Sequence, residues 1–179
     1  MIDYNFIFDK FPVVTTDRLI LRAYVVADQP TLFKMYQDKD VAREFIGEGM
    51  FMTFNDALIN ITTTYPDSFL NRKDISWAVS LKSTGEVIGQ RDLFIDHPEE
   101  PVLTQGFIRL EYRNKGYNQE VLKGIIEFLR NAKAEMLMFN CGLDNEVVLH
   151  LAKKMGFRSV FPKQVAQMTG RQKFALSIN

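Results

Sequence analysis

Apolar residues recur along this chain at two spacings, every second position in some segments and every third or fourth in others, and this pattern predicts an α/β fold. The first strand is expected over residues 18–22. Leu19 and Leu21 alternate there with positions 18, 20 and 22, so the two leucines would face a core and the alternate positions the other side of a sheet.

Two helices are expected after this strand. Asp28 suits an N-cap position, and Pro30 fits the first turn of a helix that continues to Tyr36. Residues 53–56 have the sequence Thr-Phe-Asn-Asp, which resembles a capping box with Asp in place of the usual Glu. A second helix is therefore expected to begin there and to run through Ile61.

Three strands are expected in the centre of the chain, over residues 76–81, 87–95 and 102 to about 110. Residues 82–86 form a short loop that contains a glycine, which predicts a hairpin between the first two strands. A polar turn over 96–101 separates the third strand from the second.

The second half of the chain is expected to alternate strands with helices. Leu122, Ile125 and Leu129 fall on one face of a helix over residues 118–134. Gly156 suits the C′ position of a later helix. The other expected elements are a strand over 136–141, a helix over 145–154, and closing strands over 157–161 and 174–178.

This order of elements predicts an α/β (α+β) fold class with a mixed central sheet flanked by helices. The sheet would be antiparallel in the first half of the chain and would contain a strand–helix–strand crossover in the second. The length of 179 residues fits a single domain over residues 1–179, which would bury about 70% of its unfolded surface.

Composition narrows the classes of function. The chain has 22 Lys and Arg against 22 Asp and Glu, and this balance argues against a nucleic-acid partner. Its one cysteine, Cys141, allows neither an intramolecular disulfide nor a cysteine-based metal site, and no bound metal is expected. The N-terminus lacks the basic start of a signal peptide, and no apolar stretch is long enough to span a membrane. We therefore expect a cytoplasmic protein without a membrane partner.

Residues 106–120 carry the clearest signal for function, because an expected strand runs there into a polar loop and then into a helix. Backbone N–H groups of such a loop point outward at the positive end of the helix dipole and suit a phosphate group. Arg113 or Lys115 would add a charged hydrogen bond. The alternative is an ordinary strand–helix connection in which Gly116 only permits a tight turn.

Four segments, in order and in spacing, resemble the GNAT acetyltransferases, specifically the branch of ribosomal-protein alanine N-terminal acetyltransferases. Together they cover residues 16 to about 160. The sequence RNKGY at 113–117 resembles that family's pyrophosphate motif, (Gln/Arg)-x-x-Gly-x-(Gly/Ala). The other segments are TDRLILR at 16–22 with Asp28 following, WAV at 77–79 with GEVIG at 85–89, and the closing helix from Asn145 to residues 156–157.

This resemblance implies a GNAT fold, splayed at the cofactor-binding strand, with acetyl-CoA as cosubstrate. The acceptor would be a primary amine, either a protein N-terminus or a small molecule, and it would attack the thioester directly while a backbone N–H polarises the carbonyl. The amine would enter from the opposite side of the splayed strands, near the two early helices.

The resemblance also implies a set of cofactor-binding residues. The pantetheine arm of CoA would run along Ile108, Arg109 and Leu110 and bind their main chain as an added strand does. Asn145 would hydrogen-bond the pantetheine region, although an N-cap role alone explains this residue. The pyrophosphate would lie on the amides of Arg113, Asn114, Lys115, Gly116, Tyr117 and Asn118.

Four positions depart from the family pattern. Asn118 stands where the motif has Gly or Ala, and Asn114 replaces a frequent glycine. Val148 stands where this branch often has a serine, and Ala152 where many GNAT enzymes have a tyrosine. The group that would protonate the leaving thiolate is therefore missing at both expected places.

The general base is left open among three carboxylates, Glu44, Asp92 and Glu111. A second hypothesis is a catalytically degenerate GNAT-like domain that serves as an acyl-CoA sensor or a protein-interaction module. The departures favour the sensor, whereas the retained Gly116 and Asn145 favour the enzyme. The acceptor, and whether the chain forms a homodimer, stay open. The lack of a Gly-x-Gly-x-x-Gly after the first strand of a βαβ unit argues against a dinucleotide-binding oxidoreductase.

Overall fold

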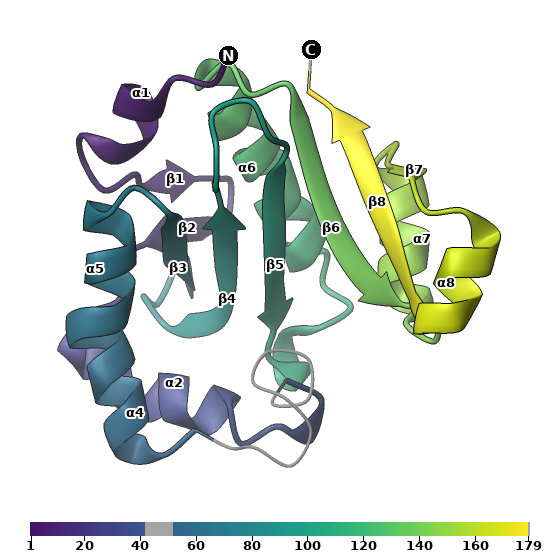
Figure 1. The fold of residues 1–179 in the computed structure, drawn as a ribbon. Coiled ribbons are helices and arrows are strands. Elements are labelled where there is room, and N and C mark those ends of the chain that lie inside the picture. The colour runs from purple at the N-terminus through teal and green to yellow at the C-terminus, as the bar shows by residue number, and fades with distance from the viewer. Residues whose placement is uncertain (42–51, 179) are drawn as a thin grey trace.

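The computed structural model describes residues 1–41 and 52–178. The strands are β1 Val14–Thr15, β2 Leu19–Arg22, β3 Asp74–Leu81, β4 Val87–Phe94, β5 Val102–Ile108, β6 Met136–Gly142, β7 Arg158–Ser159 and β8 Arg171–Ser177. They form one sheet in the order β1-β2-β3-β4-β5-β6-β8-β7 (Figure 1). All neighbours are antiparallel except β5 and β6, so the expected mixed sheet is confirmed.

Helices cover both faces of this sheet. They are α1 Tyr4–Phe8, α2 Gln29–Met35, α4 Phe54–Ile59, α5 Tyr65–Leu70, α6 Tyr117–Asn131, α7 Glu146–Lys154 and α8 Lys163–Thr169. Three short turns complete the described elements: η1 Val26–Asp28, the π-helical η2 Asn60–Thr64, and η3 Leu110–Tyr112.

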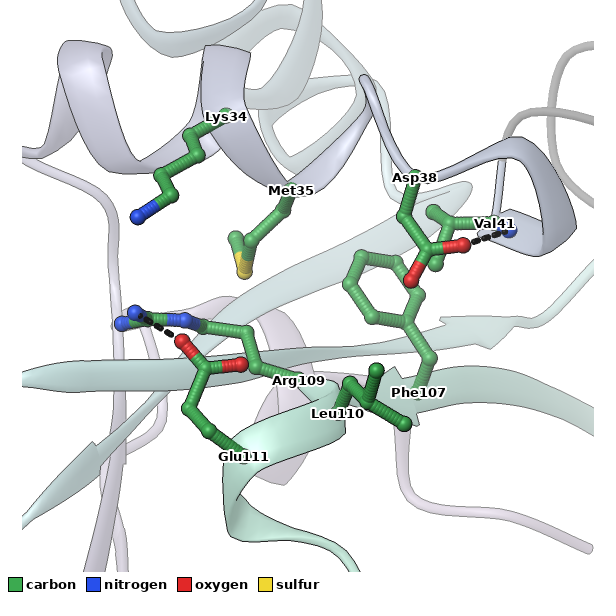
Figure 2. Close-up of a pocket in the computed structure, with 8 residues that line it drawn as sticks. All are labelled: Lys34, Met35, Asp38, Val41, Phe107, Arg109, Leu110 and Glu111. Carbon is green, nitrogen blue, oxygen red and sulfur yellow. Dashed lines mark hydrogen bonds and ion pairs between the residues drawn. The ribbon is translucent and has the colours of Figure 1, made fainter.

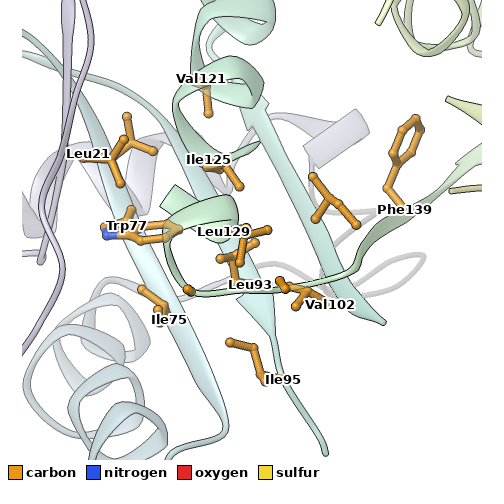
Figure 3. Close-up of a cluster of buried hydrophobic side chains, with 14 of the residues drawn as sticks. Leu21, Ile75, Trp77, Leu93, Ile95, Val102, Val121, Ile125, Leu129 and Phe139 are labelled. Carbon is orange, nitrogen blue, oxygen red and sulfur yellow. The ribbon is translucent and has the colours of Figure 1, made fainter. Parts of the chain in front are cut away.

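The larger core lies between the sheet and α6. Val121, Ile125 and Leu129 point from α6 onto the sheet, as the helical spacing predicts, and all three are fully buried (Figure 3). Trp77 of β3 is also fully buried, and its Nε1 donates a 2.7 Å hydrogen bond to the carbonyl oxygen of Pro12. A smaller core on the other face joins α2 and α4 to Ala78, Val87 and Phe107.

The strands β5 and β6 pair only at their beginning and then separate (Figure 1). Between β5 and β6, Val102 pairs with Leu137 and Leu103 with Met138, whereas β5 stays paired with β4 as far as Ile108. The N–H of Arg109 donates to Ile88 of β4. Because successive residues of a strand point their main-chain groups to opposite sides, those of Ile108 and Gly106 face β6. The sheet is thus splayed at β5, as expected.

Most predicted elements occur close to their expected bounds, and four elements were not predicted. The second helix does not end at Ile61, because the π-helical turn η2 carries it into α5 as far as Leu70. The strand expected over 157–161 shortens to β7 Arg158–Ser159. The elements without a sequence prediction are α1, β1, α5 and α8.

Asp28 is the N-cap residue of α2, as expected, but its side chain does not cap the helix. The turn η1 precedes α2, so Asp28 has helical backbone angles of φ −81° and ψ −9° and makes no side-chain cap. Its carboxylate instead accepts two hydrogen bonds from the Arg22 guanidinium, at 2.7 and 3.0 Å, and one from the N–H of Val25. The predicted capping box at Thr53 is confirmed, because Thr53 and Asp56 exchange side-chain to backbone hydrogen bonds.

Close contact between β4 and β5 predicts that Gly89 cannot be replaced. A Cβ atom at position 89 would lie 2.3 Å from the carbonyl oxygen of Phe107, and that backbone is held in the sheet. Gly85→Ala is the matched control, because Gly85 lies in the same hairpin with φ +74° and nothing within 4 Å of an added Cβ. In urea denaturation we expect Gly89→Ala to cost about 3 kcal/mol or more, and Gly85→Ala about 1–2 kcal/mol. Equal losses would contradict this interstrand constraint.

Candidate active site

The loop between β5 and α6 is built around two left-handed residues. Gly116 is the N-cap of α6 and has φ +79°, which glycine adopts without strain. Asn114 has φ +61°, and asparagine is among the few other residues that tolerate this region. The structure therefore explains both the glycine of the motif and the replacement of a second glycine by Asn114.

Arg18 and Glu120 hold this loop against the start of the sheet. The two side chains form an ion pair at 2.7 Å, and Glu120 also accepts a 2.5 Å hydrogen bond from the Thr16 hydroxyl. Nη1 of Arg18 donates to the carbonyl oxygen of Lys115 at 3.0 Å, and its guanidinium carbon lies 4.4 Å from the centre of the Tyr117 ring. The segment at 16–22 thus fixes the loop at 113–117.

A row of backbone donors is left at the start of α6. The glycine N-cap supplies no capping side chain, and the first helical bond runs from the N–H of Glu120 to the carbonyl of Gly116. Among residues 1–41 and 52–178, no hydrogen bond engages the N–H groups of residues 114–119. The N–H of Arg113, by contrast, donates to Leu110. Free N–H groups at a helix N-terminus are suited to bind an anion such as phosphate.

The charged side chains of the loop are mostly engaged within the protein. Nε of Arg113 donates to the carbonyl of Ile108 at 2.8 Å, and its Nη2 lies 3.8 Å from an Asp38 carboxylate oxygen. Arg109 pairs with Glu86 at 2.9 Å and with Glu111 at 2.5 Å. The exposed Lys115 places its ammonium 5.1 Å from the centre of the Tyr112 ring. The side chain of Leu110, 67% exposed, contributes no polar group.

The side chain of Asn118 points into the protein. Its Oδ1 accepts a short hydrogen bond from Nη2 of Arg91 on β4. An asparagine in place of Gly or Ala therefore does not have to meet a bound pyrophosphate, because an interior partner holds its side chain.

Asn145 is the N-cap of α7. Its Oδ1 accepts a 3.2 Å hydrogen bond from the N–H of Val148, which is the structural role expected without any ligand. Val148 packs half-buried against the core, and Ala152 is 1% exposed. Neither position offers a hydroxyl, so the structure does not replace the missing thiolate-protonating group there.

A polar cavity of about 370 Å³ lies on the face of the sheet opposite to α6. Tyr36, Asp56 and Tyr65 line it from the helical side. The strands β3, β4 and β5 contribute polar side chains to its floor, namely Ser76, Gln90, Asp92 and Gln105. This is the side near the early helices from which the amine was expected to enter.

Asp92 is the most perturbed carboxylate in that cavity. It is 4% exposed, and burial raises its pKa to about 6 against the opposing effect of hydrogen bonds from Gln90 and Ser76. Nε2 of Gln90 donates to both carboxylate oxygens, at 2.9 and 3.1 Å, and its Oε1 accepts from the Tyr24 hydroxyl at 3.1 Å. Asp92 is thus a mostly ionised carboxylate at neutral pH, held in one orientation.

Glu111, the other base candidate within the described residues, does not line this cavity. Glu111 is 51% exposed at its side chain and is paired with Arg109, beside a second pocket of only about 60 Å³ (Figure 2). Hydrogen bonds, including one from its own backbone N–H, lower its pKa. Glu44 lies outside the residues that the structure describes.

Arg91, 5% exposed, was not identified as a site residue from the sequence. The signal available was the charged pair Arg91-Asp92 in the middle of a strand that begins and ends with apolar residues. In the described ranges, no group of three His, Cys, Asp or Glu side chains is placed to hold a metal ion. Within the same ranges, none of the helices combines the length and the apolar character that crossing a membrane requires.

Comparisons with known proteins agree with this geometry. The N-acetyltransferase YoaA of Bacillus subtilis, itself uncharacterized, is 26% identical over 153 residues, which is 83% of this chain and 84% of YoaA. Mycobacterium smegmatis RimJ in complex with CoA-disulfide matches with a TM-score of 0.75 at 13% identity, over 93% of this chain and 87% of that one. The ribosomal L7/L12 alpha-N-protein acetyltransferase RimL, in complex with CoA, matches with a TM-score of 0.76 at 13% identity, over 93% and 98%.

The two solved structures show the shared fold, and the family model adds a match in sequence. The model described as the acetyltransferase (GNAT) domain matches residues 18–158, which include β2, the loop at Gly116 and the whole of α7. The resemblance seen in the four sequence segments is thereby confirmed, and this chain belongs to the GNAT acetyltransferase family.

Proposed function

We propose that this chain transfers the acetyl group of acetyl-CoA to a primary amine, either the α-amine of a protein N-terminus or an amine of a small molecule. Acetyl-CoA follows from membership of an acetyltransferase family, as expected from the sequence. The amine acceptor is supported most by the cavity that contains Asp92, a mostly ionised carboxylate suited to take a proton from an amine.

The proposed cofactor site uses the splayed edge of β5 and the start of α6. The free N–H groups of residues 114–119 would hold the pyrophosphate. The main-chain groups of Gly106 and Ile108, which face β6, would bind the pantetheine arm. The Ile108 carbonyl already accepts from Arg113, so its N–H is the group left for a ligand. Asn145 at the start of α7 uses only its Oδ1, and its Nδ2 donor has no hydrogen-bond partner among the described residues.

In the proposed reaction the amine nitrogen attacks the thioester carbonyl and the carbon–sulfur bond breaks. The proton lost from the amine goes to Asp92, and the departing thiolate takes a proton from water, since Val148 and Ala152 carry no hydroxyl. The hydroxide left behind takes the proton from Asp92, which restores both the water and the carboxylate. Gln105 lines the cavity from β5 opposite Asp92 in the strand register, so the cavity reaches the strand along which the pantetheine arm is proposed to lie. Holding the two reactants together supplies about 7–11 kcal/mol of the barrier reduction in well-oriented systems.

The second candidate function is an acyl-CoA sensor without catalysis, and the missing hydroxyls at 148 and 152 favour it. The two functions share the cofactor site and differ only in turnover. Calorimetric titration with CoA, followed by a thiol-release assay over a panel of amines and N-terminal peptides, separates them. Binding with turnover supports the enzyme, and binding without turnover on any acceptor supports the sensor.

Asn145→Asp tests the cofactor site. Aspartate caps a helix as well as asparagine, so the melting temperature is expected to stay within about a degree of the wild type. Aspartate offers no N–H donor and adds a negative charge, so we expect CoA affinity to fall at least about tenfold, or 1.4 kcal/mol. Unchanged affinity in titration calorimetry would leave Asn145 with the capping role alone.

Asp92→Asn tests the base. In the wild type, kcat/KM is expected to rise with pH through about 6 as Asp92 ionises. The variant should be about 10²–10⁴-fold slower and should lose this limb, keeping only the rise from deprotonation of the free amine. Glu111→Gln is the matched control, because it neutralises a carboxylate outside the cavity. If kcat/KM of the Asp92→Asn variant still rises with pH through about 6, Asp92 is excluded as the base.

Asp92 also predicts a pH-dependent cost in stability. Its pKa of about 6 in the folded protein lies above the 3.8 expected for an unfolded chain, so the folded state binds the proton more tightly. Stability therefore falls as pH rises from about 4 to 6, and the full cost is present above 6.

Asp92→Asn should remove this cost, so its stability relative to the wild type is expected to improve by about 1–3 kcal/mol between pH 4 and pH 7. The measurement is chemical denaturation at several pH values. The facing tyrosines Tyr24, Tyr36 and Tyr65 stay neutral in this range because burial raises each pKa, and Asp74 titrates in both proteins. A difference that does not vary with pH would contradict the assignment.

A further inference from the structure

The interface between α6 and the sheet contains one buried charge. Val121, Ile125 and Leu129 make this interface apolar (Figure 3), yet Arg91 of β4 enters it with 5% of its surface exposed. Arg91 pairs in register with Gly106 of β5. A Cβ atom at position 106 would lie 2.7 Å from Nε of Arg91, so the arginine side chain passes over the glycine toward the first turn of α6.

The hydrogen bonds of this arginine are incomplete. Nη2 donates to Oδ1 of Asn118 in the first turn of α6, and Nε is buried without an acceptor in the part of the chain that the structure describes. Within these described residues, Arg91 forms no ion pair. The nearest carboxylate in sequence, Asp92, lies on the opposite face of the sheet. Burial lowers the pKa of Arg91 to about 10, which leaves it protonated at neutral pH.

The position of the Arg91 guanidinium beneath the N-terminus of α6 increases the free-energy cost of burying it. A buried cation without a partner is strongly unfavourable. The N-terminus of a helix carries a partial positive charge as well, and the N-cap Gly116 adds no side chain that offsets it. Glu120 in the first turn of α6 is already paired with Arg18, and Asp92 acts on Arg91 only from the opposite face of the sheet. The protein without ligand therefore holds two positive charges that are only partly offset beneath the loop at 114–119, and an anion bound on that loop would offset both further.

We propose that Arg91, held by Asn118, is a positioning residue for acetyl-CoA, and that the pyrophosphate of the cosubstrate supplies the negative charge that this buried guanidinium lacks. This inference rests on the proposed placement of the pyrophosphate on the loop at 114–119. It also accounts for Asn118 itself. The residue that departs from the family motif is the one that holds the buried arginine.

A purely structural role for Arg91 gives a different expectation. If the arginine only fills space and fixes Asn118, its removal should lower the melting temperature and affect all ligands alike. If it is a partly offset charge that serves the pyrophosphate, its removal should relieve the ligand-free protein and weaken only ligands that carry phosphate.

Two variants change the buried charge by different routes, one by removing it and the other by giving it an ion-pair partner. Arg91→Met keeps the length of the side chain without its charge. Asn118→Asp keeps the shape of its side chain and gives Arg91 a carboxylate partner. Gln119→Glu is the control for Asn118→Asp, because it adds the same charge to the same helical turn at the next position. Arg91→Lys keeps the charge.

The measurements are the melting temperature without ligand and the affinities for CoA and for phosphate-free pantetheine by calorimetry. Arg91→Met and Asn118→Asp are each expected to raise the ligand-free melting temperature, to weaken CoA at least about tenfold and to change pantetheine affinity less than about twofold. The stabilisation by saturating CoA should shrink accordingly. Arg91→Lys should keep most of the CoA affinity, and Gln119→Glu should weaken CoA less than Asn118→Asp does.

The opposite results overturn the inference. These are unchanged CoA affinity in Asn118→Asp, an equal loss for CoA and pantetheine, or a loss in Gln119→Glu as large as that in Asn118→Asp. If Arg91→Met does not fold, Asn118→Asp with its control decides the question alone. Failure of the wild type to bind CoA is a separate outcome, because it removes the proposed cofactor site itself.

Discussion

The separation of β5 from β6 after two residue pairs is the constraint on which the candidate site depends. A strand inside a sheet normally satisfies its main chain on both sides, and buried backbone groups without partners are costly. Beyond Leu103, β5 keeps its hydrogen bonds to β4 and turns the other edge toward a strand that has moved away. The chain then enters a loop with two left-handed residues and a helix whose N-cap is a glycine. Unpaired backbone donors thus gather at one end of the sheet.

The strand β4 connects this edge to the cavity on the other face. Arg91 and Asp92 are adjacent, so the alternation of a strand sends the arginine under α6 and the aspartate into the cavity. Each charge favours the ionised form of the other, because the arginine opposes the rise in the pKa of Asp92 and the aspartate opposes the fall in that of Arg91. Gly89 and Gly106 let β4 and β5 approach closely around this pair. The proposed cofactor face and the proposed acceptor face are therefore electrostatically linked through adjacent residues of β4.

The periodicity of apolar residues predicted the helices and strands that bury one face. It could not predict features that depend on contacts between residues far apart in the sequence. The spacing of Val121, Ile125 and Leu129 is a property of α6 alone, and the Thr53 capping box is equally local. Asp28 occupies its expected N-cap position, but its side chain does not cap the helix, because the carboxylate is bound by Arg22 of the strand β2. The short helix α8 has no apolar stripe to reveal it, and only Ala166 on it is buried.

In the candidate site, too, local features could be predicted from the sequence, whereas features set by tertiary contacts could not. Gly116 and Asn114 were visible because left-handed backbone has a residue signature. Arg91 was not, because nothing in the sequence says that it lies opposite Gly106 and reaches Asn118. Asp92 could be named only as one of three carboxylates, since its significance comes from burial on a strand whose two faces are both covered.

The departures from the family motif separate into two groups with different physical consequences. In the loop, Asn114 takes a left-handed conformation and Asn118 turns inward to Arg91, so both replacements are accommodated by the structure. On α7, Val148 and Ala152 are apolar residues that carry no hydroxyl. A sensor would need the first group and would be indifferent to the second. It would have no use, however, for a carboxylate kept ionised inside a polar cavity at a cost in stability, and this feature is what favours a catalyst over a binding module.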